Sequence, residues 1–158
     1  MNTSIESVLR FVNLTTAGLL AGSLGFGKSA LTPGWQHELP RESARTLDRL
    51  LAANYFNAIG PVALGTAVTL AVGTRGTGAT RRILDAAAAV GLAGVLAATV
   101  MVTVPINREL EEQPANDYAS DRSSSLVKNW SRAHAVRTTL GVGAFICAVA
   151  SNLSSRKA

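Results

Sequence analysis

The chain has few charged residues, and long parts of it have none. Only 16% of its 158 residues are Asp, Glu, Lys or Arg, whereas 47% are hydrophobic. Four stretches contain neither a charged residue nor a histidine: residues 11–27, 50–74, 86–107 and 138–155. A helix of a soluble bundle needs a polar face that recurs on every turn, and these stretches lack one. The sequence therefore argues against a soluble helix bundle.

The chain is also poor in cysteine and histidine. Its single cysteine, Cys147, cannot form an intramolecular disulfide. With only two histidines, His37 and His134, it has no dense zinc-type motif. We predict no cofactor and no metal. A sparse copper or haem site with His134 and His37 as ligands stays open if the loop after the first helix folds over the end of the bundle.

All four uncharged stretches have a length that can cross a bilayer. A transmembrane helix needs about 17 to 25 mainly apolar residues. We therefore predict an all-α protein, a four-helix up-down transmembrane bundle in which residues 1–158 form one domain. The predicted helices cover about residues 4–27, 43–74, 80–107 and 125–152, and Ser124 or Ser125 is the expected cap of the last one.

Small residues and prolines modify these helices. Repeated glycine and alanine, as in GLAGVLAA, let helices pack closely in lipid and make a homo-oligomer plausible. Pro61 and Pro105 each remove a backbone hydrogen bond, so we expect a kink or another irregularity near both.

The basic residues predict the orientation of the chain. Its formal net charge is +5, but the basic residues are scattered over the loops rather than arranged on one face, which argues against a nucleic-acid partner. The second connection contains three arginines and no acid, whereas residues 108–128 contain five acids and three basic residues. By the positive-inside rule, the second connection and both termini are predicted to be cytoplasmic.

Unusual polar residues meet at one end of the predicted bundle. In an up-down bundle, the end of the first helix, the start of the second, the end of the third and the start of the fourth share a side. The polar and aromatic residues there are Asn54, Tyr55, Asn57, Asn107, Arg108, Trp130, His134 and Arg137. Trp130, His134 and Arg137 have the spacing i, i+4, i+7 and thus form one stripe. Ionisable groups at such a depth are costly, so their convergence favours a functional site.

Each of these residues also has a simpler interpretation. Trp130 fits an interfacial belt. Arg137 fits a snorkelling side chain or a cap for a neighbouring helix. His134 fits a buried structural histidine, and Asn57 and Asn107 fit bridges between helices.

The sequence resembles a known family in three segments. These are TTAGLLAGSLGFGKSALTPG at residues 15–34, VPINREL at 104–110 and WSRAHAVR at 130–137. They are similar to segments of the anthrone-oxygenase-like family of small four-helix membrane proteins. The resemblance implies the oxidation of an anthrone to an anthraquinone by dioxygen, a monooxygenase reaction on an aromatic polyketide.

The residues at the polar end suit that chemistry. His134 is the expected general base, because imidazole is basic and neutral near physiological pH. Arg137 and Asn107 are expected to stabilise negative charge on the substrate oxygen. Trp130, with Tyr55, Asn57 or Trp35, would form the wall for a lipophilic aromatic substrate.

Two other functions stay open at this point. A membrane carrier or scaffold could bind a lipophilic ligand between its helices without any reaction. Ion or proton conduction is disfavoured, because none of the uncharged stretches contains an acidic residue.

Overall fold

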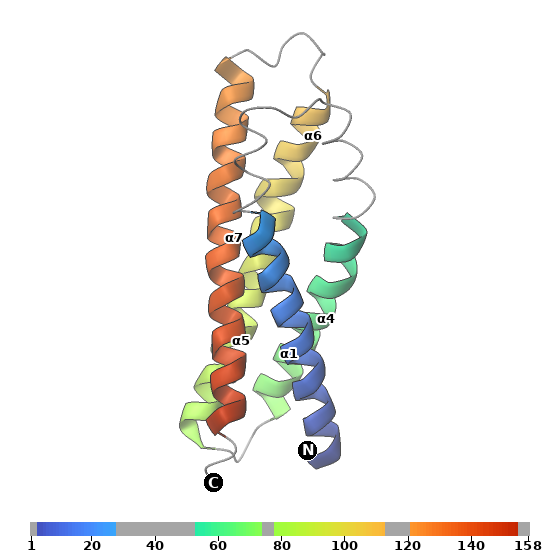
Figure 1. The fold of residues 1–158 in the computed structure, drawn as a ribbon, viewed down its shortest axis with the longest axis vertical. Coiled ribbons are helices and arrows are strands. Elements are labelled where there is room, and N and C mark those ends of the chain that lie inside the picture. Colours follow the sequence, from blue (N-terminus) through green and yellow to red (C-terminus); the bar gives the residue numbers. More distant parts are fainter. Residues whose placement is uncertain (1–2, 28–52, 74–77, 113–120, 155–158) are drawn as a thin grey trace.

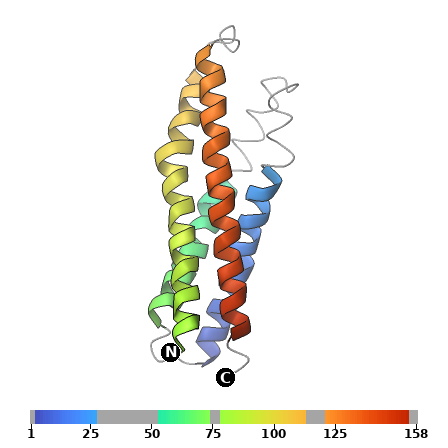
Figure 2. The same cartoon turned by 90° about the vertical axis from the view of Figure 1, so that its left-hand side faces the viewer.

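The computed structural model consists of helices packed side by side. It describes residues 3–27, 53–73, 78–112 and 121–154. Helix α1 covers Thr3–Phe26 and α4 covers Ala53–Gly73. Helices α5 (Ala79–Ala98), η3 (Thr99–Thr103) and α6 (Val104–Glu112) follow one another as one long rod, and α7 covers Asp121–Ser154. Within the described residues these elements form a bundle of four helical rods (Figures 1 and 2), which confirms the predicted fold class.

Each rod contains a segment that is long and apolar enough to cross a membrane. These segments are Thr3–Phe26, Tyr55–Gly73, Ala79–Glu109 and Ser125–Ser154. Their outward faces carry large apolar side chains, of which Phe11 is 71% and Met101 is 75% exposed. Such a surface is unfavourable in water and suits the hydrocarbon of a bilayer. The start of α1 and the end of α7 lie at the same end of the bundle (Figure 1), as an even number of crossings requires.

The helix bounds differ from the prediction at the polar end. The third rod continues to Glu112 rather than ending at residue 107, and α7 begins at Asp121 rather than at Ser124 or Ser125. Here Arg122 Nη2 lies 2.5 Å from Glu109 Oε1 and joins the two extended helices. Both helices continue past the apolar stretches, because hydrogen bonding within a helix does not require apolar side chains. The predicted start of the second helix, residues 43–52, lies outside the described residues.

Pro105 changes the helix type before it. Residues Thr99–Thr103 form a π-helix that ends two residues before the proline. Proline lacks an N–H and its ring crowds the carbonyl four residues earlier, and a wider turn relieves this conflict. The irregularity predicted at Pro105 is thus confirmed. Pro61 lies inside α4, and the kink predicted there stays a prediction.

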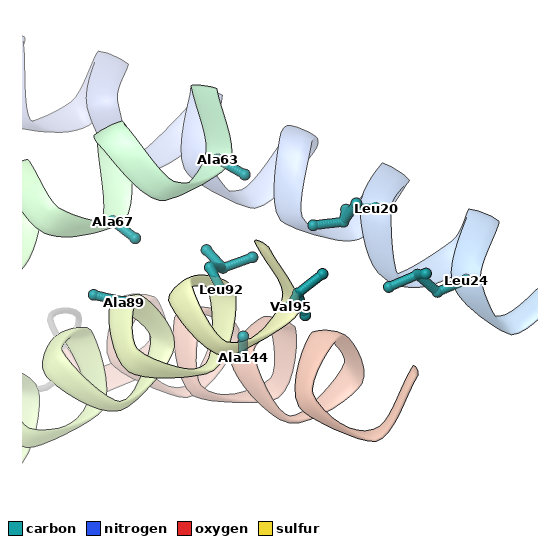
Figure 3. Packing of buried hydrophobic residues seen from close by; sticks show 8 residues of the cluster. All are labelled: Leu20, Leu24, Ala63, Ala67, Ala89, Leu92, Val95 and Ala144. Carbon is teal, nitrogen blue, oxygen red and sulfur yellow. The ribbon is translucent and has the colours of Figure 1, made fainter. Parts of the chain in front are cut away.

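The middle of the bundle is a core of small and branched apolar side chains. Figure 3 shows residues of α1, α4, α5 and α7 pointing toward one another. The fully buried members include Leu20, Leu24 and Leu92, which alternate with alanines of the facing helices. Leucine against alanine fills the space without separating the backbones, and dispersion contacts therefore hold the helices together in lipid.

Glycines bring α5 and α7 into close contact. A Cβ atom added to Gly91 would lie 3.0 Å from Ala144 Cβ and 3.2 Å from the Leu140 carbonyl oxygen. At Gly94 it would lie 3.0 Å from Leu140 Cδ1. This close approach fixes the position of α7, the helix that carries Trp130, His134 and Arg137.

A buried ion pair connects three helices at the end where α1 begins. Arg10 of α1 donates to both carboxylate oxygens of Asp85 on α5, at 3.3 and 3.1 Å. Ser151 of α7 accepts from Arg10 Nη1 at 3.2 Å and donates to Asp85 Oδ1 at 2.5 Å. Arg10 is 6% and Asp85 is 4% exposed. Each polar group in this triad thus has partners inside the protein, as a water-free interior requires.

Asp85 corrects part of the sequence interpretation. The argument against conduction considered only the uncharged stretches, but the membrane-spanning segment Ala79–Glu109 also includes Asp85. The carboxylate is held on both oxygens by Arg10, which is the arrangement of a structural ion pair.

We expect Gly91→Val to destabilise the bundle by about 1–3 kcal/mol, because the new side chain forces α5 and α7 apart. Gly22→Val is the matched control, since a Cβ atom at Gly22 meets nothing within 4 Å. Both replacements change helix propensity equally. Equilibrium unfolding in detergent measures the two losses, and equal losses would contradict the close packing described for α5 and α7.

Replacing Asp85 alone should cost more than replacing the whole ion pair. Asp85→Ala leaves the buried Arg10 guanidinium without its main partner, which typically costs about 3–5 kcal/mol. In the double variant Arg10→Leu/Asp85→Leu no buried charge remains, and we expect most of the stability to return. Unfolding of both variants in detergent tests this, and a double variant as unstable as Asp85→Ala would refute it.

Candidate active site

Trp130 and His134 of α7 lie against each other at the end of the bundle opposite the ion pair. Their ring centroids are 5.0 Å apart and their planes differ by 4°, so the rings are stacked. The spacing i, i+4 places them one turn apart on the same face. His134 is only 7% exposed and Trp130 is half-buried. Stacking thus restricts the rotation of the imidazole ring.

The imidazole is oriented by the C-terminal end of α1. His134 Nε2 lies 3.1 Å from the carbonyl oxygen of Leu24. Leu24 belongs to the last turn of α1, which ends at Phe26. Since a carbonyl oxygen can only accept, Nε2 must carry the proton, and a neutral imidazole then has its lone pair on Nδ1. The end of α1 therefore selects one tautomer of His134.

Gly27 allows this approach. A Cβ atom at residue 27 would lie 3.0 Å from His134 Nε2, which is closer than a carbon atom normally comes. Gly25, two residues earlier, has no atom within 4 Å of the corresponding position. The glycine at residue 27 thus makes room for the ring.

Arg137 lies one turn deeper than His134 and faces other elements. It is 5% exposed, so it faces the interior of the bundle rather than lipid. Its Nη1 donates to Thr103 Oγ1 of η3 at 3.1 Å, and its Cζ lies 5.6 Å from the ring centroid of Phe56 on α4. Thr103 is the last residue of the π-helix ahead of Pro105. The guanidinium is therefore held by a hydroxyl and an aromatic face.

The other predicted residues have different positions. Asn107 is half-buried on α6, one turn after Thr103 and on the same face of the rod. Tyr55 Oη donates to the Leu19 carbonyl at 3.1 Å, so this side chain joins α4 to α1. Asn57 lies on the exposed side of α4, away from the buried stripe of α7.

Some of the predictions fall where the structure gives no description. The side chain of Asn54 and all of Trp35 and His37 lie outside the described residues. The copper or haem hypothesis for His37 and His134 thus stays a prediction. In the described ranges no three His, Cys, Asp or Glu side chains come close enough together to hold a metal ion.

Several contacts of the site were missed from the sequence. They involve the Leu24 carbonyl, Gly27, Phe56 and Thr103. A signal existed for Thr103, because Pro105 predicts a disturbed turn that redirects the side chains before it. The Leu24 carbonyl is a backbone group, so no side-chain pattern could reveal it.

The arrangement combines two kinds of chemical group at a buried end of the bundle. One is an imidazole of fixed tautomer with an aromatic ring stacked on it. The other is a guanidinium three residues further along the same helix. A base and a cation on one rigid helix suit a reaction in which a proton is removed and negative charge develops.

Comparison with known proteins supports the family suggested by the sequence. Neither the comparison with curated proteins nor the comparison with solved structures finds a match. A family model described as Anthrone oxygenase matches residues 49–147, more than half of the chain. The match includes Asn107, Trp130, His134 and Arg137, whereas α1 with Leu24 and Gly27 lies before it. The chain belongs to the anthrone oxygenase family.

Proposed function

We propose that the protein is a membrane oxygenase that oxidises an aromatic, polyketide-like substrate of the anthrone type with dioxygen. The observation that carries this function is the buried His134, with its tautomer set by the Leu24 carbonyl, on the same helix as the buried Arg137. Membership of the anthrone oxygenase family supports the reaction class.

His134 acts as the general base in this proposal. Its Nδ1 atom takes a proton from the methylene carbon between the two aromatic rings of the substrate. The resulting imidazolium keeps its Nε2–H bond to the Leu24 carbonyl. That carbonyl belongs to the C-terminal end of α1, where the helix dipole favours a positive charge. The site thus stabilises the protonated base.

The reaction then proceeds on the substrate and balances without a further reductant. Loss of the proton leaves an electron-rich enolate, which gives one electron to dioxygen. Recombination of the two radicals forms a carbon–oxygen bond, and uptake of the proton from His134 gives a hydroperoxide. Loss of water from the hydroperoxide turns this carbon into the second carbonyl group. One anthrone and one dioxygen give one anthraquinone and one water.

Arg137 and Asn107 stabilise the enolate oxygen in this scheme. The guanidinium is held by Thr103 and Phe56 and is shielded from water, so its attraction for a developing oxyanion is strong. Asn107 would add an amide N–H one turn closer to the rim. Both groups act on charge that forms only during the reaction, which is the condition for lowering the barrier.

Trp130 provides an aromatic surface for the substrate, and a bilayer provides access. Polycyclic substrates and dioxygen both dissolve in lipid. The four apolar rods support an integral membrane protein. We propose the orientation in which the start of α1 and the end of α7 are cytoplasmic, and the active site then lies at the opposite face.

The first prediction from this function concerns the base. His134→Ala should lower the rate of anthraquinone formation by about 10²–10⁴-fold, the usual contribution of a general base. The purified protein is incubated with an anthrone and dioxygen, and the quinone is followed by its absorbance. Binding of the substrate, measured by quenching of tryptophan fluorescence, should change little.

The same experiment separates the enzyme from a carrier. Full turnover in His134→Ala would exclude the proposed base. A protein that binds the anthrone but never forms quinone above the uncatalysed background would be a carrier of lipophilic ligands, and the oxygenase function would be refuted.

The second prediction concerns the space beside the imidazole. Gly27→Ala places a methyl group 3.0 Å from the present position of His134 Nε2 and should displace the ring from the Leu24 carbonyl. We expect turnover to fall by about tenfold or more, as small displacements of catalytic groups do. Gly25→Ala is the control with the same chemical change, and it should keep full activity. Equal activity of both variants would show that the contact with α1 does not position the base.

A further inference from the structure

A groove lies beside the ion pair at the end of the bundle opposite His134. It has a volume of about 530 Å³ and lies mainly along α1. Charged side chains of Glu6, Arg10 and Arg81 line it together with hydroxyl groups of Thr3 and Ser7. Phe11 and Leu14, further along α1, line its apolar part. The groove thus changes from polar to apolar along the direction that enters the membrane.

The length of the groove is comparable to that of a lipid head group together with the first part of its acyl chain. Thr3 and Leu14 are separated by about 16 Å along the helix axis, given about 1.5 Å per residue. The polar side chains of α1 come from its first turns. These turns lie at the end of the bundle where α1 begins and α7 ends (Figure 1). A molecule with a polar head group and an acyl chain could place its head group in the polar part of the groove and its chain in the apolar part.

The guanidinium group of Arg81 in the groove favours an anionic head group. Glu6 Oε1 accepts from Arg10 Nε at 2.9 Å and also from Arg81 Nη2, so two guanidinium groups share one carboxylate. Asp85, the other acid, lies behind Arg10 and does not line the groove. Arg10 is thus paired with two carboxylates, whereas Arg81 contacts Glu6 alone and its buried Nε atom has no hydrogen-bond partner within the described residues. Arg82, the next residue, is exposed and does not line the groove.

We propose that this groove binds the head group of an anionic phospholipid, with Arg81 as the main contact to the phosphate and with Phe11 and Leu14 against the upper acyl chain. Arginine suits this task because its planar guanidinium can donate to a phosphate while another edge stays bonded to Glu6. The site is independent of His134 and of the oxygenase function.

The test measures lipid retention by the full chain. The purified protein in detergent is titrated with phosphatidylglycerol or with phosphatidylcholine of the same acyl chains, and bound lipids are counted by native mass spectrometry. We expect one phosphatidylglycerol to be held in preference. Arg81→Gln should weaken its binding about fivefold, the effect of one basic residue of about 1 kcal/mol near anionic lipid. Arg82→Gln removes the same charge outside the groove and should leave the binding unchanged.

A second variant keeps the test valid if Arg81→Gln alters the fold. Ser7→Trp fills the groove without removing any charge, and it should release the bound lipid while the unfolding temperature stays near that of the wild type. Three results would overturn the proposal: equal retention of phosphatidylcholine, equal weakening by Arg82→Gln, or displacement of the lipid by inorganic phosphate at equal concentration. The last would identify a phosphate site without lipid recognition.

Discussion

The exclusion of water from the interior of the bundle is the constraint on which the rest of the structure depends. Every polar group between the helices must then find its partner in the protein. In the described residues most of the buried polar side chains lie in two layers, one around Arg10 and Asp85 and one around His134 and Arg137. Between the layers, the core is made of alanine, leucine and valine (Figure 3). The two polar ends are thus separated by an apolar section in which small residues set the helix distances.

Most of the fold could be predicted, because long stretches without charged residues indicate membrane-spanning helices. A stretch without ionisable residues over the thickness of a bilayer has few alternatives to a membrane-spanning helix. The ion pair was missed for the same reason. Arg10 and Asp85 lie just outside the uncharged stretches, near the starts of the predicted helices 4–27 and 80–107, so this signal did not include them. The position of Ser151, and the sharing of Glu6 between Arg10 and Arg81, depend on helix rotation, which hydropathy does not contain.

For the candidate site, periodicity was informative within one helix and uninformative between helices. The spacing of Trp130, His134 and Arg137 predicted one stripe on α7, along which His134 and Arg137 are buried and Trp130 is half-buried. It could not predict that His134 contacts α1 while Arg137 contacts η3 and α4. Asn57 was grouped with them because of its depth in the membrane, yet its direction around α4 turns it outward. Depth can be inferred from sequence position, whereas rotation about the helix axis requires knowledge of the packing.

The two polar layers are connected mechanically through α1. Arg10 fixes this helix to α5 and α7 at one end, and Leu24 meets His134 about 21 Å further along the same axis, given about 1.5 Å per residue. A helix of this length is stiff, so a rotation of α1 at Arg10 also moves the Leu24 carbonyl. The contact of α5 with α7 at Gly91 fixes the other partner. The position of the Leu24 carbonyl beside His134 is therefore set by how α1 packs against the other helices along its whole length.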